Sequence, residues 1–232
     1  TFVRVNNSAG LSVEITSPAN NTYQNSTITI VAAASATSGI SQVEFYNGST
    51  TDGRNRIGVD TTPPYSITFT TSNVVDGAQL LIAKAYDNNG TALTAESVPI
   101  TITVDNTAPT VTVQYPTATV YKKSGDALSV NYIYTETNPD KVQLNVSNNT
   151  HTAGGATFST GLVSGTSVTR NDSVIINPTA LEGTYNVTAV VLDRVSQRAS
   201  NSQTQIVVVD NSAPTVSISS PTTGTINGTV TF

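Results

Sequence analysis

One phrase recurs at intervals of about one hundred residues, and it constrains the fold more than any other feature of the sequence. "VDNTAPTVTVQYP" occupies 104–116, "VDNSAPTVSISSP" occupies 209–221, and a diverged form, "VNNSAGLSVEITSP", occupies 5–18. Pro18 and Pro116 are 98 residues apart, and Pro116 and Pro221 are 105 apart. Because this spacing is the commonest size of a domain, the phrase marks domain boundaries, and the 232-residue chain is predicted to hold two domains.

Between the repeated phrases, apolar and polar residues alternate in short runs, which indicates β-strands. The runs are bounded by Gly, Pro, Asn and Asp, and no stretch has the 3.6-residue apolar period of a helix. Such a pattern is typical of an antiparallel sandwich or barrel. The predicted strands are 11–17, 28–34, 42–47, 57–60, 65–69, 80–87 and 98–104 in the first repeat, and 111–114, 128–135, 141–146, 156–160, 168–176, 184–193 and 204–208 in the second.

The two repeats align residue by residue around one strand. "DGAQLLIAKAYD" (76–87) matches "EGTYNVTAVVLD" (182–193), with an acid–Gly pair at the start and an Asp at the end of each. Alternation predicts inward side chains at Leu81, Ala83 and Ala85 in the first repeat. In the second repeat it predicts them at Tyr185, Val187 and Ala189.

The first repeat resembles the immunoglobulin-like repeats that occur in tandem on bacterial and archaeal surface proteins. The residues that carry the resemblance are an inward aromatic (Phe45), a Pro-Tyr pair (Pro64, Tyr65), an acid–Gly turn (Asp76, Gly77) and an Asp-rich hairpin at 87–90. The second repeat lacks the Pro-Tyr pair and has a longer Ser/Thr/Gly-rich loop at 147–167. "LEGTYNVT" in that repeat resembles the tyrosine corner of immunoglobulin sandwiches, with Tyr185 bracing the corner.

The resemblance implies an all-β fold of tandem immunoglobulin-like antiparallel β-sandwiches. The first domain is predicted at 11–105 and the second at 109–210, with the repeated phrase as the hinge between them. Residues 1–5 are expected to be the last strand of a preceding domain, and 213–232 the first strands of a following one.

The residue types that carry most enzyme chemistry are scarce. The chain has no Cys and one His, His151, in a polar loop, and no glycine-rich phosphate loop is present. The Asp and Glu residues fall mostly in turns, where their side chains bind their own backbone. We therefore predict a protein without enzymatic activity, and no cofactor is required.

Charge and hydropathy exclude two further classes of partner. The net charge is −5 and no run of Lys or Arg occurs, so nucleic acid is not a predicted partner. No window of 18 consecutive apolar residues is present, so no transmembrane segment is predicted.

Calcium is the inorganic ligand that the acidic residues favour. The resemblance places the loop after the second strand and the hairpin after the sixth at the end where the chain enters each domain. This would bring acids of the hinge and of the second domain together near the base of the first. Calcium takes six to eight oxygen ligands. The alternative is that each acid caps its own turn, since no EF-hand spacing is present. The candidates are Asp76, Asp105, Glu136, Asp140 and Asp193.

Ten asparagines stand in Asn-x-Ser/Thr sequons, and we predict that several carry N-glycans. Asn186 alternates with inward residues of its strand and Asn145 with those of another, so both are expected to face outward. The sequon residues are Asn6, Asn20, Asn25, Asn47, Asn89, Asn145, Asn148, Asn171, Asn186 and Asn227.

One outer strand face is predicted to mediate assembly between copies of the chain. Leu80, Ile82 and Tyr86 alternate with the inward residues of 80–87, and three large side chains on an exposed sheet favour packing against a neighbour. The alternative is that the loop at 48–60 covers them within the same chain.

Together these features predict a structural component of an extracellular, cell-surface assembly such as an S-layer, stalk or filament. Low Lys and Glu content and hydroxyl-rich strands resemble archaeal surface proteins more than bacterial ones. Two alternatives fit the same sequence: an adhesin or carbohydrate-binding module, and spacer domains of a secreted hydrolase. Few aromatic residues are available for stacking against sugars, because Trp is absent and most Tyr lie in strands.

Overall fold

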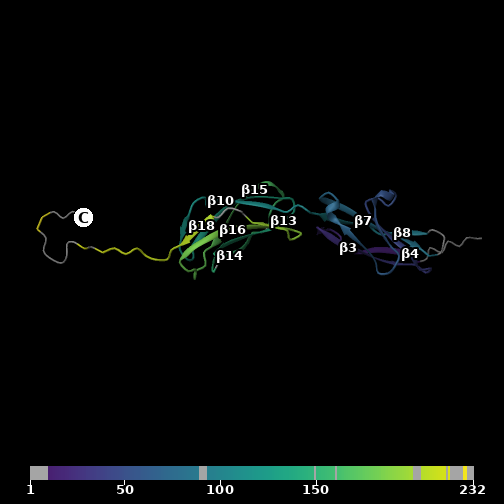
Figure 1. Cartoon of the computed structure of the whole chain (residues 1–232), viewed down its shortest axis with the longest axis horizontal. Coiled ribbons are helices and arrows are strands. Elements are labelled where there is room, and N and C mark those ends of the chain that lie inside the picture. Colours follow the sequence, from purple (N-terminus) through teal and green to yellow (C-terminus); the bar gives the residue numbers. More distant parts are fainter. Residues whose placement is uncertain are drawn as a thin grey trace, which may run out of the picture.

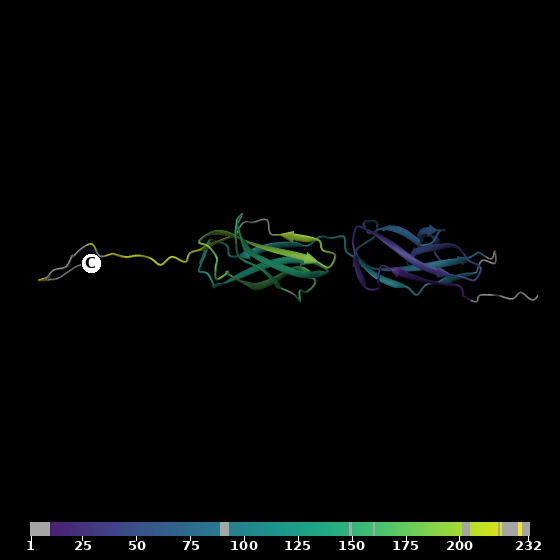
Figure 2. The same cartoon turned by 90° about the horizontal axis from the view of Figure 1, so that it is seen from below.

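The computed structural model describes residues 10–88, 93–148, 150–159, 161–200, 205–217, 219 and 227–228. These residues form two β-sandwiches that follow one another along a line, the first in purple to blue and the second in teal to green (Figure 1, Figure 2). The two 3₁₀ turns described, Gly53–Asn55 and Thr71–Asn73, are three residues long. The predicted all-β, immunoglobulin-like fold is confirmed.

Domain 1 packs a three-stranded sheet, in the order β1-β3-β6, against a larger sheet in the order β2-β9-β7-β4-β5, with β8 beside β7. The strands of the described part of this domain are β1 (Ser12–Ser17), β2 (Thr22–Gln24), β3 (Thr27–Ser35), β4 (Ile40–Asn47), β5 (Arg56–Asp60), β6 (Tyr65–Thr70), β7 (Gly77–Asp87), β8 (Thr94–Glu96) and β9 (Ile100–Val104).

Domain 2 repeats this topology strand for strand. One sheet has the order β10-β12-β15, and the other has the order β11-β18-β16-β13-β14 with β17 beside β16. Its described strands are β10 (Thr110–Tyr115), β11 (Val120–Lys122), β12 (Ala127–Glu136), β13 (Pro139–Ser147), β14 (Thr152–Ser159), β15 (Gly165–Ile175), β16 (Gly183–Asp193), β17 (Arg198–Ser200) and β18 (Gln205–Val209).

One pair of strands in each domain departs from the antiparallel arrangement that the sequence predicts. β2 pairs in parallel with β9, and β11 pairs in parallel with β18. In both cases the chain leaves the small sheet after a shift in strand register and joins the edge of the large sheet for three residues. Three residues are too few to show an alternation, which is why these short strands were not predicted.

The cores lie where the alternation places them. Leu81, Ala83 and Ala85 are fully buried in domain 1, with Phe45 opposite in the same core. In domain 2, Val187 and its neighbours on β16 are buried in the same way. The predicted register of the central strands is therefore confirmed.

The predicted tyrosine corner is present in domain 2, and domain 1 has an equivalent built from a different residue. The hydroxyl of Tyr185 donates to the carbonyl oxygen of Leu181, four residues earlier, at 2.8 Å. At the aligned position in domain 1, the amide of Gln79 donates to the carbonyl oxygen of Val75, also four residues earlier, at 2.8 Å. A glutamine thus makes the bond that the tyrosine makes, which sequence comparison of the two repeats did not predict.

The long loop that distinguishes the second repeat is held by a tyrosine of β12. The Tyr134 hydroxyl donates to the carbonyl oxygen of Val163 at 2.7 Å and accepts from the N–H of the same residue at 3.1 Å. Because Tyr134 is buried in the core, this pair of bonds ties the loop before β15 to the interior of the sandwich. Tyr132, two residues earlier, reaches the carboxylate of Asp172 on β15 at 2.5 Å.

The segment after β18 contains no strand over the part that is described, 211–217, and it is exposed. The other residues assigned to neighbouring domains, 1–5 and most of 218–232, lie outside the described residues. The assignment of both ends to further domains stays a prediction.

Candidate functional site: the joint between the two domains

The repeated phrase forms a hydrogen-bonded clasp where the chain leaves each domain. In domain 1, the carboxylate of Asp76 accepts from the N–H of Asn106 at 2.9 Å and from the hydroxyl of Thr107 at 2.7 Å. In domain 2, the carboxylate of Glu182 accepts from the N–H of Asn211 at 3.1 Å and from the hydroxyl of Ser212 at 2.6 Å. We call this arrangement the exit clasp. It explains why an acid–Gly pair and the phrase Asp-Asn-Ser/Thr recur together.

The acid of the clasp is followed by a glycine because the turn needs a positive φ. Gly77 has a φ of 121°, a region that side chains with a Cβ rarely adopt. Burial alone would raise the pKa of the Asp76 carboxyl, but the hydrogen bonds from Thr107 and Asn106 outweigh it and hold the pKa below its ordinary value. Asp76 is therefore a charged anchor for the departing chain.

Asp105, the residue between the last strand of domain 1 and the clasp, connects the two domains. Its N–H donates to the backbone carbonyl oxygen of Gln24 at 2.9 Å. In domain 2, the N–H of Asp210 donates in the same way to the carbonyl oxygen of Lys122 at 2.9 Å. Across the joint, one carboxylate oxygen of Asp105 accepts from the amide of Asn138 at 3.0 Å, and its backbone carbonyl accepts from the amide of Gln197 at 3.0 Å.

A cationic side chain adds a further contact across the joint. The guanidinium of Arg194 in domain 2 lies over the ring of Tyr23 in domain 1, 5.1 Å from its centroid. The N–H of Arg194 also donates to the carbonyl oxygen of Asn138 at 3.0 Å, which ties together two turns of domain 2 that face domain 1. The two domains are thus connected by the contacts of Asp105 and by the contact between Arg194 and Tyr23.

Three acids are buried in this joint: Asp105, Glu136 and Asp193, which are 1%, 4% and 2% exposed. We call them the joint acids. Glu136 accepts from the N–H of Asn138 at 2.7 Å. One oxygen of Asp193 accepts from the N–H groups of Val195 and Gln197, at 2.9 and 2.8 Å. The other oxygen of Asp193, Oδ2, is buried and has no hydrogen-bond partner.

The joint acids repel one another. Burial raises the pKa of the Glu136 carboxyl, and the charges of Asp105 and Asp193 raise it further. Burial likewise raises the pKa of Asp193, with the charge of Asp105 adding to it against the backbone hydrogen bonds. None of the ion pairs found in the described part of the chain includes a joint acid.

The structure brings together three of the five residues predicted to bind calcium and separates two. Asp140 is exposed and pairs with Lys141 at 3.7 Å, and the Asp76 carboxylate is taken up by the exit clasp. As the side chains stand, no three His, Cys, Asp or Glu groups among the described residues lie close enough to enclose a metal ion. Domain 1 has a related feature at its own entry end, where Oδ1 of Asp87, the counterpart of Asp193, is buried without a partner.

The predicted glycosylation sites differ in whether the amide nitrogen of the asparagine donates a hydrogen bond and in whether the side chain is exposed. Asn47 donates its amide to Gln79 at 2.9 Å, and Asn148 donates its amide to the carbonyl oxygen of Thr184 at 3.2 Å. Asn145 lies on the outer face of β13 but is half-buried beside Gln143. Asn6 and Asn89 lie outside the described residues. The exposed sequon residues of the described chain are Asn20, Asn171, Asn186 and Asn227.

The premise of the predicted assembly face is wrong, because two of its three side chains are not exposed apolar groups. Ile82 is 8% exposed and only Leu80, at 41%, faces solvent. Tyr86 donates its hydroxyl to Glu44 at 2.7 Å. The buried Glu44 carboxylate also accepts from Tyr46 at 2.5 Å and from Arg56 at 2.7 Å. The outer face of domain 1 is therefore covered by a polar cluster centred on Glu44, which a strand alternation does not reveal.

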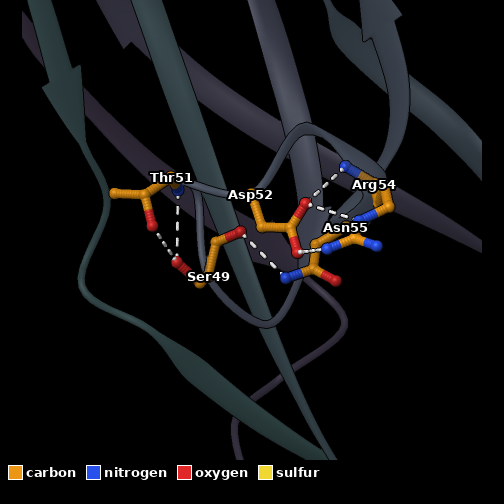
Figure 3. A network of polar contacts seen from close by, with 5 residues as sticks. All are labelled: Ser49, Thr51, Asp52, Arg54 and Asn55. Atoms are coloured by element: carbon orange, nitrogen blue, oxygen red, sulfur yellow. Dashed lines mark hydrogen bonds and ion pairs between the residues drawn. The ribbon is translucent and has the colours of Figure 1, made fainter.

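The loop between β4 and β5 borders this face and holds its own shape (Figure 3). Asp52 accepts from the N–H of Arg54 at 3.0 Å and from its guanidinium at 3.2 Å, while Asn55 donates to the carbonyl oxygen of Ser49 at 3.3 Å. The loop is tied to β8 by Thr50, whose hydroxyl donates to Glu96 at 2.6 Å. The alternative, in which the loop at 48–60 folds over Leu80, Ile82 and Tyr86, stays a prediction.

The described residues show no constellation of catalytic groups. His151 lies exposed in the turn between β13 and β14, where its N–H donates to Asn148 at 2.7 Å and its ring contacts the adjacent Thr150 hydroxyl. A surface hollow of about 350 Å³ lies between β1 and β3, lined by Ser12, Glu14, Ser35 and neighbours. It offers one carboxylate and no base or nucleophile pair. No helix in the described part of the chain is long and apolar enough to cross a membrane.

Two family models match parts of the chain, and both describe immunoglobulin-like domains. Residues 12–102 match the family model described as "Bacterial Ig domain", and residues 177–232 match the one described as "Bacterial Ig-like domain (group 3)". No curated protein sequence matches the chain. A solved structure of a membrane anchored protein from Corynebacterium diphtheriae is 12% identical, with a TM-score of 0.32. That match covers 88% of this chain and 59% of the other.

Domains of these families are generally not catalytic and are typical of cell-surface proteins. The first model falls on domain 1, and the second covers the last strands of domain 2 and the segment that follows them. The two matches therefore support immunoglobulin-like domain repeats in this chain, at residues 12–102 and 177–232.

Proposed function

We propose that this chain is a non-enzymatic spacer in an extracellular structure of the cell surface, in which tandem sandwiches hold a fixed orientation to one another. The observation that carries the proposal is the joint, in which Asp105 is bonded to domain 2 through both its side chain and its backbone. A flexible linker would need none of these contacts, whereas a rod that has to keep its length and direction needs them at every boundary.

The exit clasp supports this function because it is built twice. The clasp at Glu182 fixes the chain as it leaves domain 2, although the segment that follows is exposed. Fixing the exit direction at each boundary is useful if further domains continue the rod. An S-layer, a stalk or a filament would each suit such a rod, and assembly of copies is part of this proposal without an assigned contact surface.

The two alternatives make different demands on the surface. An adhesin or carbohydrate-binding module needs a site that recognises a ligand, and the exposed large apolar side chains of the described residues come from both domains and from several strands and loops. Spacer domains of a secreted hydrolase would use the same joint and differ only in what the whole polypeptide carries. The rod-like joint serves both a surface scaffold and such a hydrolase.

N-glycosylation is part of the proposal if the host has an N-glycosylation pathway. The composition resembles that of archaeal surface proteins. The exposed sequon residue Asn186 lies on β16 between two core residues, and the exposed Asn171 lies on β15 between Arg170 and Asp172, which form an ion pair at 3.3 Å. A glycan there leaves the core intact. Asn47 and Asn148 would first have to release the hydrogen bonds of their amide nitrogens.

Brief protease treatment of intact native cells, followed by mass spectrometry of the released peptides, tests this proposal. We expect peptides of both domains in the released fraction, with glycan on Asn171 or Asn186 more often than on Asn47 or Asn148. A cytoplasmic marker protein serves as the control for lysis. Recovery of this chain only after lysis would rule out the surface role, and bare asparagines at all sequons would rule out the glycans alone.

A further inference from the structure

We propose that the exit end of domain 2, where the chain leaves it, is a docking surface for the next immunoglobulin-like domain of the same polypeptide. The surface is formed by Tyr121, Lys122, Lys123 and Asp210, and its partner is an entry end that presents an arginine and side-chain amides. This rests on the proposed function, in which further domains continue the rod, and it names the residues and the partner of the next joint.

The exit ends of the two domains are built from equivalent residues. In domain 1, Tyr23 lies on β2, which pairs in parallel with the last strand, β9, and Asp105 follows that strand. In domain 2, Tyr121 lies on β11, which pairs in parallel with the last strand, β18, and Asp210 follows it. The N–H of each aspartate donates to the short edge strand of its domain at 2.9 Å. Tyr121 and Asp210 therefore occupy the positions of Tyr23 and Asp105.

At the joint between the two domains, the tyrosine and the aspartate of this pair are both contacted by domain 2. The guanidinium of Arg194 lies over the Tyr23 ring, 5.1 Å from its centroid. Asp105 accepts from the side-chain amides of Asn138 and Gln197, both at 3.0 Å, and it is 1% exposed. The partner of such an exit end is thus a set of one guanidinium and two amides.

At the exit end of domain 2, the equivalent pair is exposed. The Tyr121 side chain is 69% exposed, and the exposed Asp210 accepts from the N–H of Ser212 in its own turn at 3.0 Å. A shallow hollow of about 470 Å³ lies here, bordered by Tyr121, Lys122 and Asp210 among others. Because the same ring is covered by a guanidinium at the first joint, the exposed ring is suited to the same contact.

The charge of this exit end favours an acidic partner. Lys122 and Lys123 stand where domain 1 has uncharged residues at 24–25, so domain 2 carries two positive charges that domain 1 lacks. The entry end that docks on domain 1 contains the buried carboxylates of Glu136 and Asp193. Opposite charges on two facing surfaces fix their orientation and exclude other partners. An entry end like that of domain 2 therefore fits the exit end of domain 2.

A second copy of this chain fits less well, because its available entry end belongs to domain 1. The N–H of Asn88 donates there to the carbonyl oxygen of Gly39 at 3.0 Å, as the N–H of Arg194 donates to that of Asn138 in domain 2. Asn88 and Gly39 thus take the positions of Arg194 and Asn138. This entry end offers neither the guanidinium nor the amide that the surface requires.

The course of the chain favours the next domain as the partner. The segment after β18 begins with the phrase that leads from domain 1 directly into β10, and it runs away from domain 1 (Figure 1, Figure 2). A domain begun by residues 213–232 would therefore start beside the exposed Tyr121 ring, as domain 2 starts beside Tyr23.

A chain with a third sandwich tests the surface. Residues 1–213 are joined directly to 109–217, so that a second copy of domain 2 follows the first and presents to it the entry end that docks on domain 1. Ser173→Cys in each copy, at an exposed position of β15, carries a spin label. Double electron–electron resonance should give a single narrow distance distribution, because the second joint forms as the first does.

Tyr121→Ala in the first copy removes the ring and should broaden this distribution about twofold, since the linker then contributes more to the orientation. Tyr121→Phe is the matched control, because it keeps the ring face that a guanidinium covers, and its distribution should stay narrow. Arg194→Ala in the added copy removes the other partner of the contact and should broaden the distribution as Tyr121→Ala does. Circular dichroism verifies that each variant is folded.

A broad distribution in the parent three-domain chain would overturn the proposal, and so would one that neither Tyr121→Ala nor Arg194→Ala changes. Sedimentation velocity of the wild-type chain is the parallel measurement. Association of that chain which Tyr121→Ala abolishes would assign the surface to a second copy and also overturn the proposal. The protease experiment on cells is independent: a chain found on the surface of cells but broad in this measurement keeps its proposed function and loses this docking surface.

Discussion

Replacing Glu44 by alanine is expected to destabilise domain 1 by about 3 kcal/mol or more, since each buried hydrogen-bonding group left without a partner costs ~1–3 kcal/mol. The Glu44 carboxylate accepts from Tyr46, Tyr86 and Arg56, and it is 5% exposed. Its loss leaves two tyrosine hydroxyls facing a gap. For a domain of this size, the melting temperature should fall by roughly 10 °C or more.

Glu44→Gln is the matched variant, because it keeps the shape and an acceptor oxygen but removes the charge. It should cost less than Glu44→Ala. Burial alone would raise the pKa of Glu44, but the bonds from Tyr46, Tyr86 and Arg56 hold it below its ordinary value of 4.5. A carboxyl group whose pKa is lowered on folding stabilises the folded state at pH values above its pKa in the unfolded chain. This stabilisation is lost as the pH falls through the pKa of the folded state.

Differential scanning calorimetry of the two-domain chain measures both variants, with the transition of domain 2 as an internal reference. The difference between the wild type and Glu44→Gln should shrink as the pH falls below 4.5 and through the lowered pKa of Glu44 in the folded state. A melting curve of Glu44→Ala that coincides with that of the wild type would show that the polar cluster of the outer face contributes nothing.

Gly154→Ala is the second substitution with a large expected effect, because it forces the two sheets of domain 2 apart. A Cβ at Gly154 would lie 2.6 Å from the backbone oxygen of Ile175, the last residue of β15. Backbone cannot rotate away as a side chain can, so the cost should reach or exceed the upper end of the ~1–3 kcal/mol typical of overpacking. The strand gains a little in return, since Gly is the least favourable residue in a strand interior.

Gly58→Ala in domain 1 is the natural comparison. Gly58 lies on β5, the counterpart of β14, and a Cβ there would lie 2.6 Å from a methyl carbon of Ile67. Because a side-chain methyl can move, this variant should be less destabilising than Gly154→Ala. Chemical unfolding in urea, followed by far-ultraviolet circular dichroism, gives the two free energies. A larger loss for Gly58→Ala would contradict the account of how each sandwich closes.

Much of the fold could be predicted from the sequence, because core strands obey a period of two. The inward set Leu81, Ala83 and Ala85 is buried as the alternation requires, and the corner at Tyr185 forms the expected backbone bond. The repeated phrase located the boundary between the domains. Its physical role, however, appears only when Asp76 and Asn106 are seen to bond across 30 positions of the chain.

The outer faces could not be predicted in the same way. Alternation shows that Ile82 and Tyr86 point away from the core, but it does not show what lies above them. The hydroxyl of Tyr86 donates to Glu44, which is 42 positions away in the sequence. The neighbouring loop between β4 and β5 is held by hydrogen bonds between its own residues. In the joint, the sequence brought Asp140 into the predicted calcium set because it is near in the chain, whereas its side chain is exposed. The direction of a side chain at a turn is set by tertiary contacts, and the alternation of apolar and polar residues in the sequence does not predict these contacts.

The central claim is that the joint holds the two domains in one orientation, and a distance measurement between them tests it most directly. The chain has no Cys, so Thr29→Cys in β3 and Ser173→Cys in β15, both exposed, allow a pair of spin labels to be placed without removing native thiols. Double electron–electron resonance in calcium-containing buffer should give a single narrow distance distribution. Adding Asp76→Ala and Asn138→Ala, which remove the exit clasp and a bond across the joint, should broaden it. A distribution that is already broad in the otherwise wild-type chain would contradict the account.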